Sequence, residues 1–78
     1  MKKILRLEIP ASRVKEPFIY RMVTQHNLVP NILEADLEKG KNGILKLEVG
    51  GKPADIESGI LFLREADIEV EELSTNRS

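Results

Sequence analysis

The chain has 78 residues, of which 12 are basic and 13 acidic, so its formal net charge is −1. A chain of this length forms one domain and not two, and its near-balance of charge lacks the basic footprint of a nucleic-acid-binding domain. The sequence contains no cysteine, which excludes disulfides, thiolate metal sites, bound iron–sulfur clusters and cysteine nucleophiles.

The first residues, Met1–Leu5, begin like a signal peptide, with two lysines before an apolar pair. The apolar run ends at Arg6, whereas a signal peptide needs about seven to fifteen apolar residues. No stretch of the sequence approaches the roughly 18 apolar residues of a membrane span. We therefore expect a cytoplasmic protein with no direct membrane insertion.

The first part of the chain predicts a strand and a helix. Apolar and charged residues alternate over Leu5–Ile9, which is the period of a half-buried strand, and Pro10 ends the pattern. Pro17 suits the first turn of a helix, where its missing N–H leaves no hydrogen bond unmade. Apolar residues at helical spacing then predict a helix over Pro17–His26, with Asn27 as a left-handed cap.

The middle of the chain predicts a β-hairpin. Alternation over Leu33–Leu37, and again over Leu45–Val49, indicates two strands that turn their apolar side chains inward. The stretch Glu38–Gly43 is rich in turn residues and is typical of a hairpin loop. In either nearest register Lys46 lies opposite a carboxylate of the preceding strand, a pairing worth a few tenths to about 1 kcal/mol.

The last part predicts a second helix and a last strand. Pro53 suits a first helical turn, and the apolar stripe that follows ends near Ala66. Alternation from Ile68 predicts a strand that fades by Leu73, with residues 74–78 as a tail. We therefore expect a single domain over residues 1–78 whose core covers about 4–73.

The predicted order is β-α-β-β-α-β. Right-handed crossovers in both β-α-β units leave one simple solution. This is the α+β class with a ferredoxin-like fold, a four-stranded antiparallel sheet with two helices on one face. The other face carries charged residues and is either a solvated sheet face or a partner surface: Arg6, Glu8, Glu34, Asp36, Lys46, Glu48, Glu69 and Glu71.

Catalytic constellations are scarce in the sequence. His26 is the one histidine, and at a helix C-terminus a histidine is usually a surface residue. No phosphate-binding loop occurs, the acidic residues near the C-terminus alternate along a strand instead of clustering, and the central strands offer no aromatic residue on which RNA bases stack. We expect no enzyme activity, no cofactor, no metal site and no nucleic-acid partner.

The most specific segment follows Pro30, where Asn31-Ile32-Leu33 spells N-I-L. Glycines precede and follow the third strand, at Gly43 and at Gly50-Gly51, and the chain continues to the ending Ile68-Glu69-Val70-Glu71-Glu72-Leu73. In this order the features resemble the NIL domain, a family named after the tripeptide. The resemblance covers nearly the whole chain, roughly from Ile4 to Leu73.

NIL domains are known in two settings. One is the C-terminal regulatory domain of the ATPase subunit of bacterial methionine importers, where the domain pairs with its twin and binds methionine near their interface. The other is an N-terminal extension of 4Fe–4S ferredoxin-type proteins. This chain has neither cluster cysteines nor an ATPase domain, so it looks like a free-standing NIL domain or one excised from a larger protein.

The resemblance assigns a ligand site to Asn31, with Ile32 and Leu33 beside it, one toward the open face and one toward the core. The alternative is that Asn31 only caps the start of a strand. Met22 and Leu28 either line an apolar pocket or belong to the core.

Two functions follow from the resemblance. The first is a homodimeric regulatory domain that binds an amino acid such as methionine. The second is a protein-interaction module, without a small-molecule ligand, that docks onto a ferredoxin-type or transporter partner through a sheet edge or the charged face.

Overall fold

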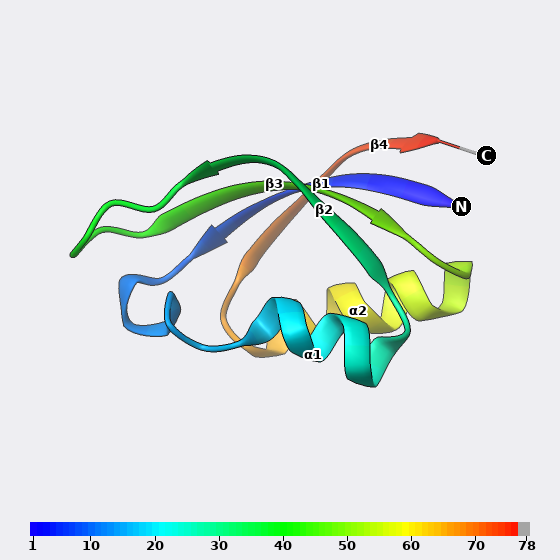
Figure 1. The fold of residues 1–78 in the computed structure, drawn as a ribbon, viewed down its shortest axis with the longest axis horizontal. Helices are drawn as coiled ribbons and strands as arrows, with labels where there is room; N and C mark the ends of the chain where they lie inside the picture. The colour runs from blue at the N-terminus through cyan, green and yellow to red at the C-terminus, as the bar shows by residue number, and fades with distance from the viewer. Residues whose placement is uncertain (77–78) are drawn as a thin grey trace.

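A computed structural model describes residues 1–76 of the chain. Its elements are β1 (Lys2–Ile9), a short 3-10 turn η1 (Ala11–Arg13), α1 (Phe18–His26), β2 (Val29–Asp36), β3 (Gly43–Gly50), α2 (Pro53–Glu65) and β4 (Glu69–Asn76). The strands form one sheet in the order β2-β3-β1-β4, and all neighbours are antiparallel. Both helices lie on one face of this sheet and leave the other open (Figure 1). The predicted ferredoxin-like α+β fold is confirmed.

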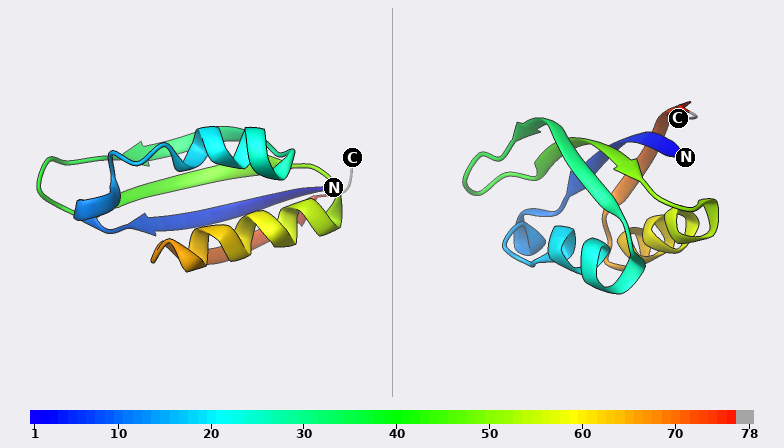
Figure 2. Two further views of the ribbon diagram at one scale, coloured as in Figure 1. Left: turned by 90° about the horizontal axis from the view of Figure 1, so that it is seen from below. Right: turned by 45° about the vertical axis from the view of Figure 1, so that its right-hand side comes forward.

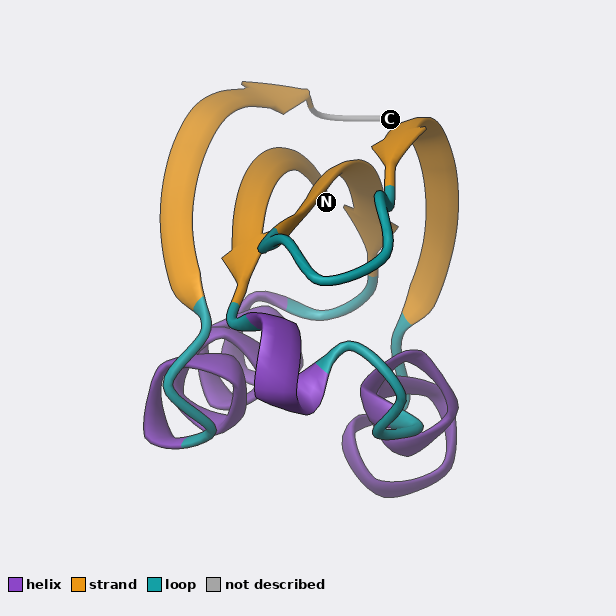
Figure 3. Cartoon of the chain, turned by 90° about the vertical axis from the view of Figure 1, so that its left-hand side faces the viewer, coloured by secondary structure: helices purple, strands orange, loops and turns teal. Residues whose placement is uncertain are grey.

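The two layers enclose one hydrophobic core. The helices lie side by side against the sheet and run roughly along its strands (Figure 2), and the strands curve over them (Figure 3). Met22 is fully buried in this core and Leu28 is 2% exposed, so both are core residues and neither lines a pocket. Gly59 lets α2 lie close to Leu28, because a Cβ at Gly59 would collide with a methyl group of that side chain.

The helix ends follow the predicted local chemistry. Pro53 occupies the first turn of α2, and α1 ends at Asn27, whose φ of 56° is left-handed. A second left-handed residue, Asp67 at φ 63°, leads from α2 into β4. Asparagine and aspartate tolerate this conformation better than most residues because their short polar side chains bond locally.

Three predicted strand limits are wrong. Strand β1 begins at Lys2 and not at Leu5. Strand β2 begins at Val29, so Pro30 and Asn31 lie inside the strand. Strand β4 reaches Asn76 instead of fading by Leu73, because β1 begins at Lys2 and offers residues 74–76 backbone partners. The remainder of the predicted tail, residues 77–78, lies outside the described residues.

The inward orientation predicted for β2 is also wrong in part. Leu33 is 47% exposed and Leu37 is 54% exposed, although both were expected to face the core. The register shifts by one residue between Ile32 and Glu34, which makes Leu33 the extra residue of a β-bulge. Leu37 lies beyond the end of β2, where the β2–β3 hairpin projects past the helices (Figure 1).

Candidate functional site

The three residues of the N-I-L motif take three different environments on β2. Asn31 lies opposite Glu48. The residues on either side of Glu48 in β3 are buried, so Glu48 points to the open face. Asn31 points to the same face, because directly opposed residues share a face. Ile32 lies opposite the buried Leu47 on the helix side, yet it is 58% exposed. Leu33 is the bulge residue. Ile32 thus lies on the core side of the sheet, as expected for one motif residue, but at this edge it is not buried.

Asn31 borders a hollow at one end of the open face. The hollow has a volume of about 480 Å³, within the range of roughly 300–1,000 Å³ that is usual for ligand pockets. Strand β2 begins here, β3 ends here and β1 begins here, because the strands are antiparallel. Its lining includes Lys2, Val29, Asn31, Glu48, Gly51 and Lys52.

The polar groups around this hollow carry both charges. The ammonium of Lys2 lies 3.8 Å from a carboxylate oxygen of Glu48. Lys52 precedes the first turn of α2 as its N-cap residue and takes part in no ion pair among residues 1–76. The amide of Asn31 has no side-chain hydrogen bond to any other described residue. The hollow therefore presents cations, a carboxylate and a free amide around an apolar edge at Val29, which is 68% exposed.

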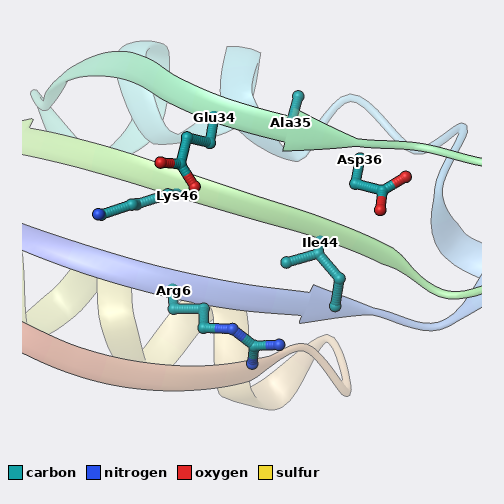
Figure 4. Close-up of a pocket in the computed structure, with 6 residues that line it drawn as sticks. All are labelled: Arg6, Glu34, Ala35, Asp36, Ile44 and Lys46. Carbon is teal, nitrogen blue, oxygen red and sulfur yellow. The ribbon is translucent and has the colours of Figure 1, made fainter.

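A second, smaller hollow of about 190 Å³ lies further along the same face. Its lining includes Arg6, Glu34, Asp36 and Lys46, and in Figure 4 the side chains of Arg6 and Lys46 extend in opposite directions along the sheet. Arg6 and Lys46 are register partners, and Glu34 lies opposite Lys46, as predicted. Neither cation forms an ion pair within the described part of the chain. This hollow contains no motif residue.

The outer edge of β2 is unusually apolar. It pairs only with β3, so its other side presents free backbone N–H and C=O groups. Four large apolar side chains on and beside it are exposed: Val29 68%, Ile32 58%, Leu33 47% and Leu37 54%. An edge of this kind is a surface that other chains can cover.

His26 has a structural environment. Its Nδ1 lies 3.0 Å from the hydroxyl oxygen of Ser58, and its ring lies 5.0 Å from the ring of Phe62. These contacts join α1 to α2, and among the described residues no carboxylate forms a hydrogen bond with the ring to orient it as a catalytic base. Within residues 1–76 no group of three or more metal-ligating side chains gathers in one place. The described helices are all too short or too polar to cross a bilayer.

Lys2 and Lys52 were not identified as site residues from the sequence, and Glu48 was identified only as part of the charged face. They are far apart in sequence and meet because of the strand register. Lys2 lies opposite Gly50, and the Gly50-Gly51 turn brings Lys52 back beside them. That turn after a strand was the signal that could have marked this end of the sheet.

Comparisons with known proteins agree on one family. The family model of the NIL domain matches residues 3–72. The methionine import ATP-binding protein MetN 1 of Paraburkholderia xenovorans is 32% identical over 74 residues, which are 91% of this chain and 22% of that protein. MetN 2 of Staphylococcus epidermidis is 48% identical over 40 residues, which are 51% of this chain and 12% of that protein. The chain thus spans about a fifth or less of these relatives.

A solved structure agrees with this match. The C-terminal domain of an ABC transporter/ATP-binding protein from Enterococcus faecalis has a TM-score of 0.80 and 25% identity to this chain, covering 95% of this chain and 86% of that one. A de novo designed protein, Foldit4, shares the fold alone, with a TM-score of 0.61 at 15% identity. On the family match over residues 3–72, this chain belongs to the NIL domain family.

Proposed function

We propose that this chain is a regulatory domain that binds an amino acid such as methionine and acts as a homodimer. The observation that carries the proposal is the position of Asn31, whose amide borders the larger hollow of the open face. An amide both donates and accepts hydrogen bonds, which suits a ligand that bears an ammonium and a carboxylate. The named relatives are methionine import ATP-binding proteins, which makes methionine the first ligand to test.

The apolar edge of β2 supports the homodimer. A second copy that pairs its own β2 antiparallel to this one would satisfy the free backbone groups and cover Val29, Ile32 and Leu33 at once. Two sheets would then join into one, with a motif asparagine on each side of the junction. In this arrangement Ile32 and Leu33 contribute to ligand binding through the subunit contact, since neither lines the hollow.

Calorimetric titration with methionine tests the ligand, with thermal denaturation as a second readout. Bound methionine stabilises the folded chain by mass action. The variant Asn31→Ala should bind about tenfold more weakly, because a hydrogen bond to a charged group contributes about 1.5–3 kcal/mol. The matched control is Glu34→Ala, which removes an exposed side chain from the same face of the same strand. Absence of both heat and thermal shift at millimolar methionine would sink the assignment.

The free edge also favours a second function, docking of a ferredoxin-type or transporter protein by strand addition. A retained protein partner, with no heat from any amino acid, would support this alternative. Weaker retention by Ile32→Lys would locate the contact on β2.

A further inference from the structure

We propose that the larger hollow recognises both charged ends of a free amino acid, with Glu48 binding the α-ammonium and Lys52 the α-carboxylate. This inference rests on the proposed function and names the groups that decide which ligands are accepted. It separates the role of these charges from that of the Asn31 amide.

Glu48 is suited to the ammonium because its carboxylate forms only a long ion pair, with Lys2. Lys2 lies 3.8 Å from it, beyond the roughly 2.7–2.9 Å of a charge-assisted hydrogen bond. The carboxylate therefore keeps its acceptor sites for another donor. Its side chain is 24% exposed, so part of its surrounding water is already removed, which strengthens a new charged hydrogen bond.

Lys52 is suited to the carboxylate for two reasons. Its ammonium takes part in no ion pair within the part of the chain that the structure describes, so a ligand anion displaces no protein partner. It also precedes the first turn of α2, a helix whose N-terminal end carries partial positive charge. Cations and the carboxylate of Glu48 thus line one hollow, an arrangement that can pair with both the carboxylate and the ammonium of a zwitterion.

The smaller hollow provides the internal comparison. Arg6 and Lys46 also lie on the open face beside the carboxylates Glu34 and Asp36, but no motif amide is near them. If charge alone attracted amino acids, both hollows would bind them. The variant Lys46→Met thus removes a cation from the same face and the same strand as Glu48 without touching the proposed site.

The test compares methionine with N-acetylmethionine, which lacks the ammonium, and with methioninamide, which lacks the carboxylate. On the unaltered protein, each analogue should bind about tenfold or more weakly than methionine, since each loses one charged partner. Using ligands instead of variants keeps the folded protein unchanged.

Two variants then assign the ends. Glu48→Gln should weaken methionine binding about tenfold and leave N-acetylmethionine binding unchanged, because that contact is already lost. Lys52→Met should weaken methionine binding about tenfold and leave methioninamide binding unchanged. Lys46→Met should alter none of the affinities. Equal binding of methionine and both analogues would overturn this inference and leave the proposed function standing. Failure of methionine itself to bind would overturn the proposed function first.

Discussion

The two edge strands of the sheet, β2 and β4, are alike in construction and opposite in chemistry. Each has 8 residues, each pairs on one side only, and each register shifts by one residue at a leucine. These bulge leucines, Leu33 and Leu73, are 47% and 44% exposed. The architecture therefore treats both edges equally, and the side chains alone distinguish them.

Leu73 follows the acidic pair Glu71-Glu72, whereas Leu33 lies between the exposed Ile32 and Glu34. Charged residues and bulges are the usual means by which proteins prevent edge strands from pairing with other chains. Strand β4 has both, with Glu69, Glu71 and Glu72 along its length. Strand β2 has the bulge, and carboxylates only after it at Glu34 and Asp36, while the part before the bulge exposes Val29 and Ile32. The comparison indicates that one edge is protected and the other is available.

The largest expected effect is on self-association. Leu33→Lys should raise the dissociation constant of the proposed homodimer by about tenfold or more, because it buries a charge in an apolar contact. Leu73→Lys, the same change at the equivalent bulge, should leave the dimer intact. Light scattering or sedimentation over a concentration series measures both, with circular dichroism to verify folding.

Equal dissociation by the two variants would remove the distinction between the edges. A wild-type chain that stays monomeric at millimolar concentration would contradict the homodimer itself.

A smaller effect is expected on the stability of the monomer, where Val70 of β4 and Ile32 of β2 differ in how they pack. Val70 of β4 lies opposite Leu7 and packs against the core, whereas Ile32 of β2 lies opposite Leu47 but is 58% exposed. Val70→Ala should lower the free energy of unfolding of the monomer by about 1 kcal/mol, and Ile32→Ala by less than about 0.5 kcal/mol. Urea denaturation of dilute protein measures both. A larger loss from Ile32→Ala would mean that the β2 edge is packed within one chain.

The smallest effect concerns the charge on β4. Lys3 donates a hydrogen bond to Glu72, and this bond holds the pKa of the Glu72 carboxyl below its ordinary value of 4.5. Burial acts in the opposite direction, and the positive charges of Lys3 and Arg64 lower the pKa further. A carboxyl whose pKa is lower in the folded state stabilises the fold at any pH above its ordinary pKa. This stabilisation is lost as the pH falls through the lowered pKa. Because Glu72 is 43% exposed, solvent screens most of the effect.

Glu72→Gln should therefore be slightly less stable than the wild type at neutral pH, and the difference should disappear as the pH is lowered below 4.5. Paired urea titrations across this range give the measurement. A difference that grows on acidification would have the wrong sign.

Much of the fold was predictable because local rules determine it. Alternation and helical spacing located the elements, and Pro17, Pro53 and Asn27 marked helix ends through constraints that act within a few residues. Alternation also assigned the charged residues of the open face, since the strand registers bring Glu8 opposite Glu69 and Arg6 opposite Glu71.

The site was predictable only in its motif. Alternation counted back from Leu33 directs Asn31 toward the helices, and a bulge leaves no clear mark in the residue pattern. Lys2, Glu48 and Lys52 meet through long-range register that a single strand does not reveal. The exposure of Ile32 could not be predicted either, because burial at a sheet edge depends on what lies beyond it.

The bulge at Leu33 also has a consequence for the motif as a unit. In an unbroken strand, two residues three positions apart point to opposite sides, so with Glu34 in solvent Asn31 would be turned into the interior. The additional leucine resets the phase, and Asn31 and Glu34 emerge on the same side. The tripeptide thus includes a one-residue register shift as well as three side chains. If the asparagine were placed in another sheet without the bulge leucine, its amide would point to the opposite face.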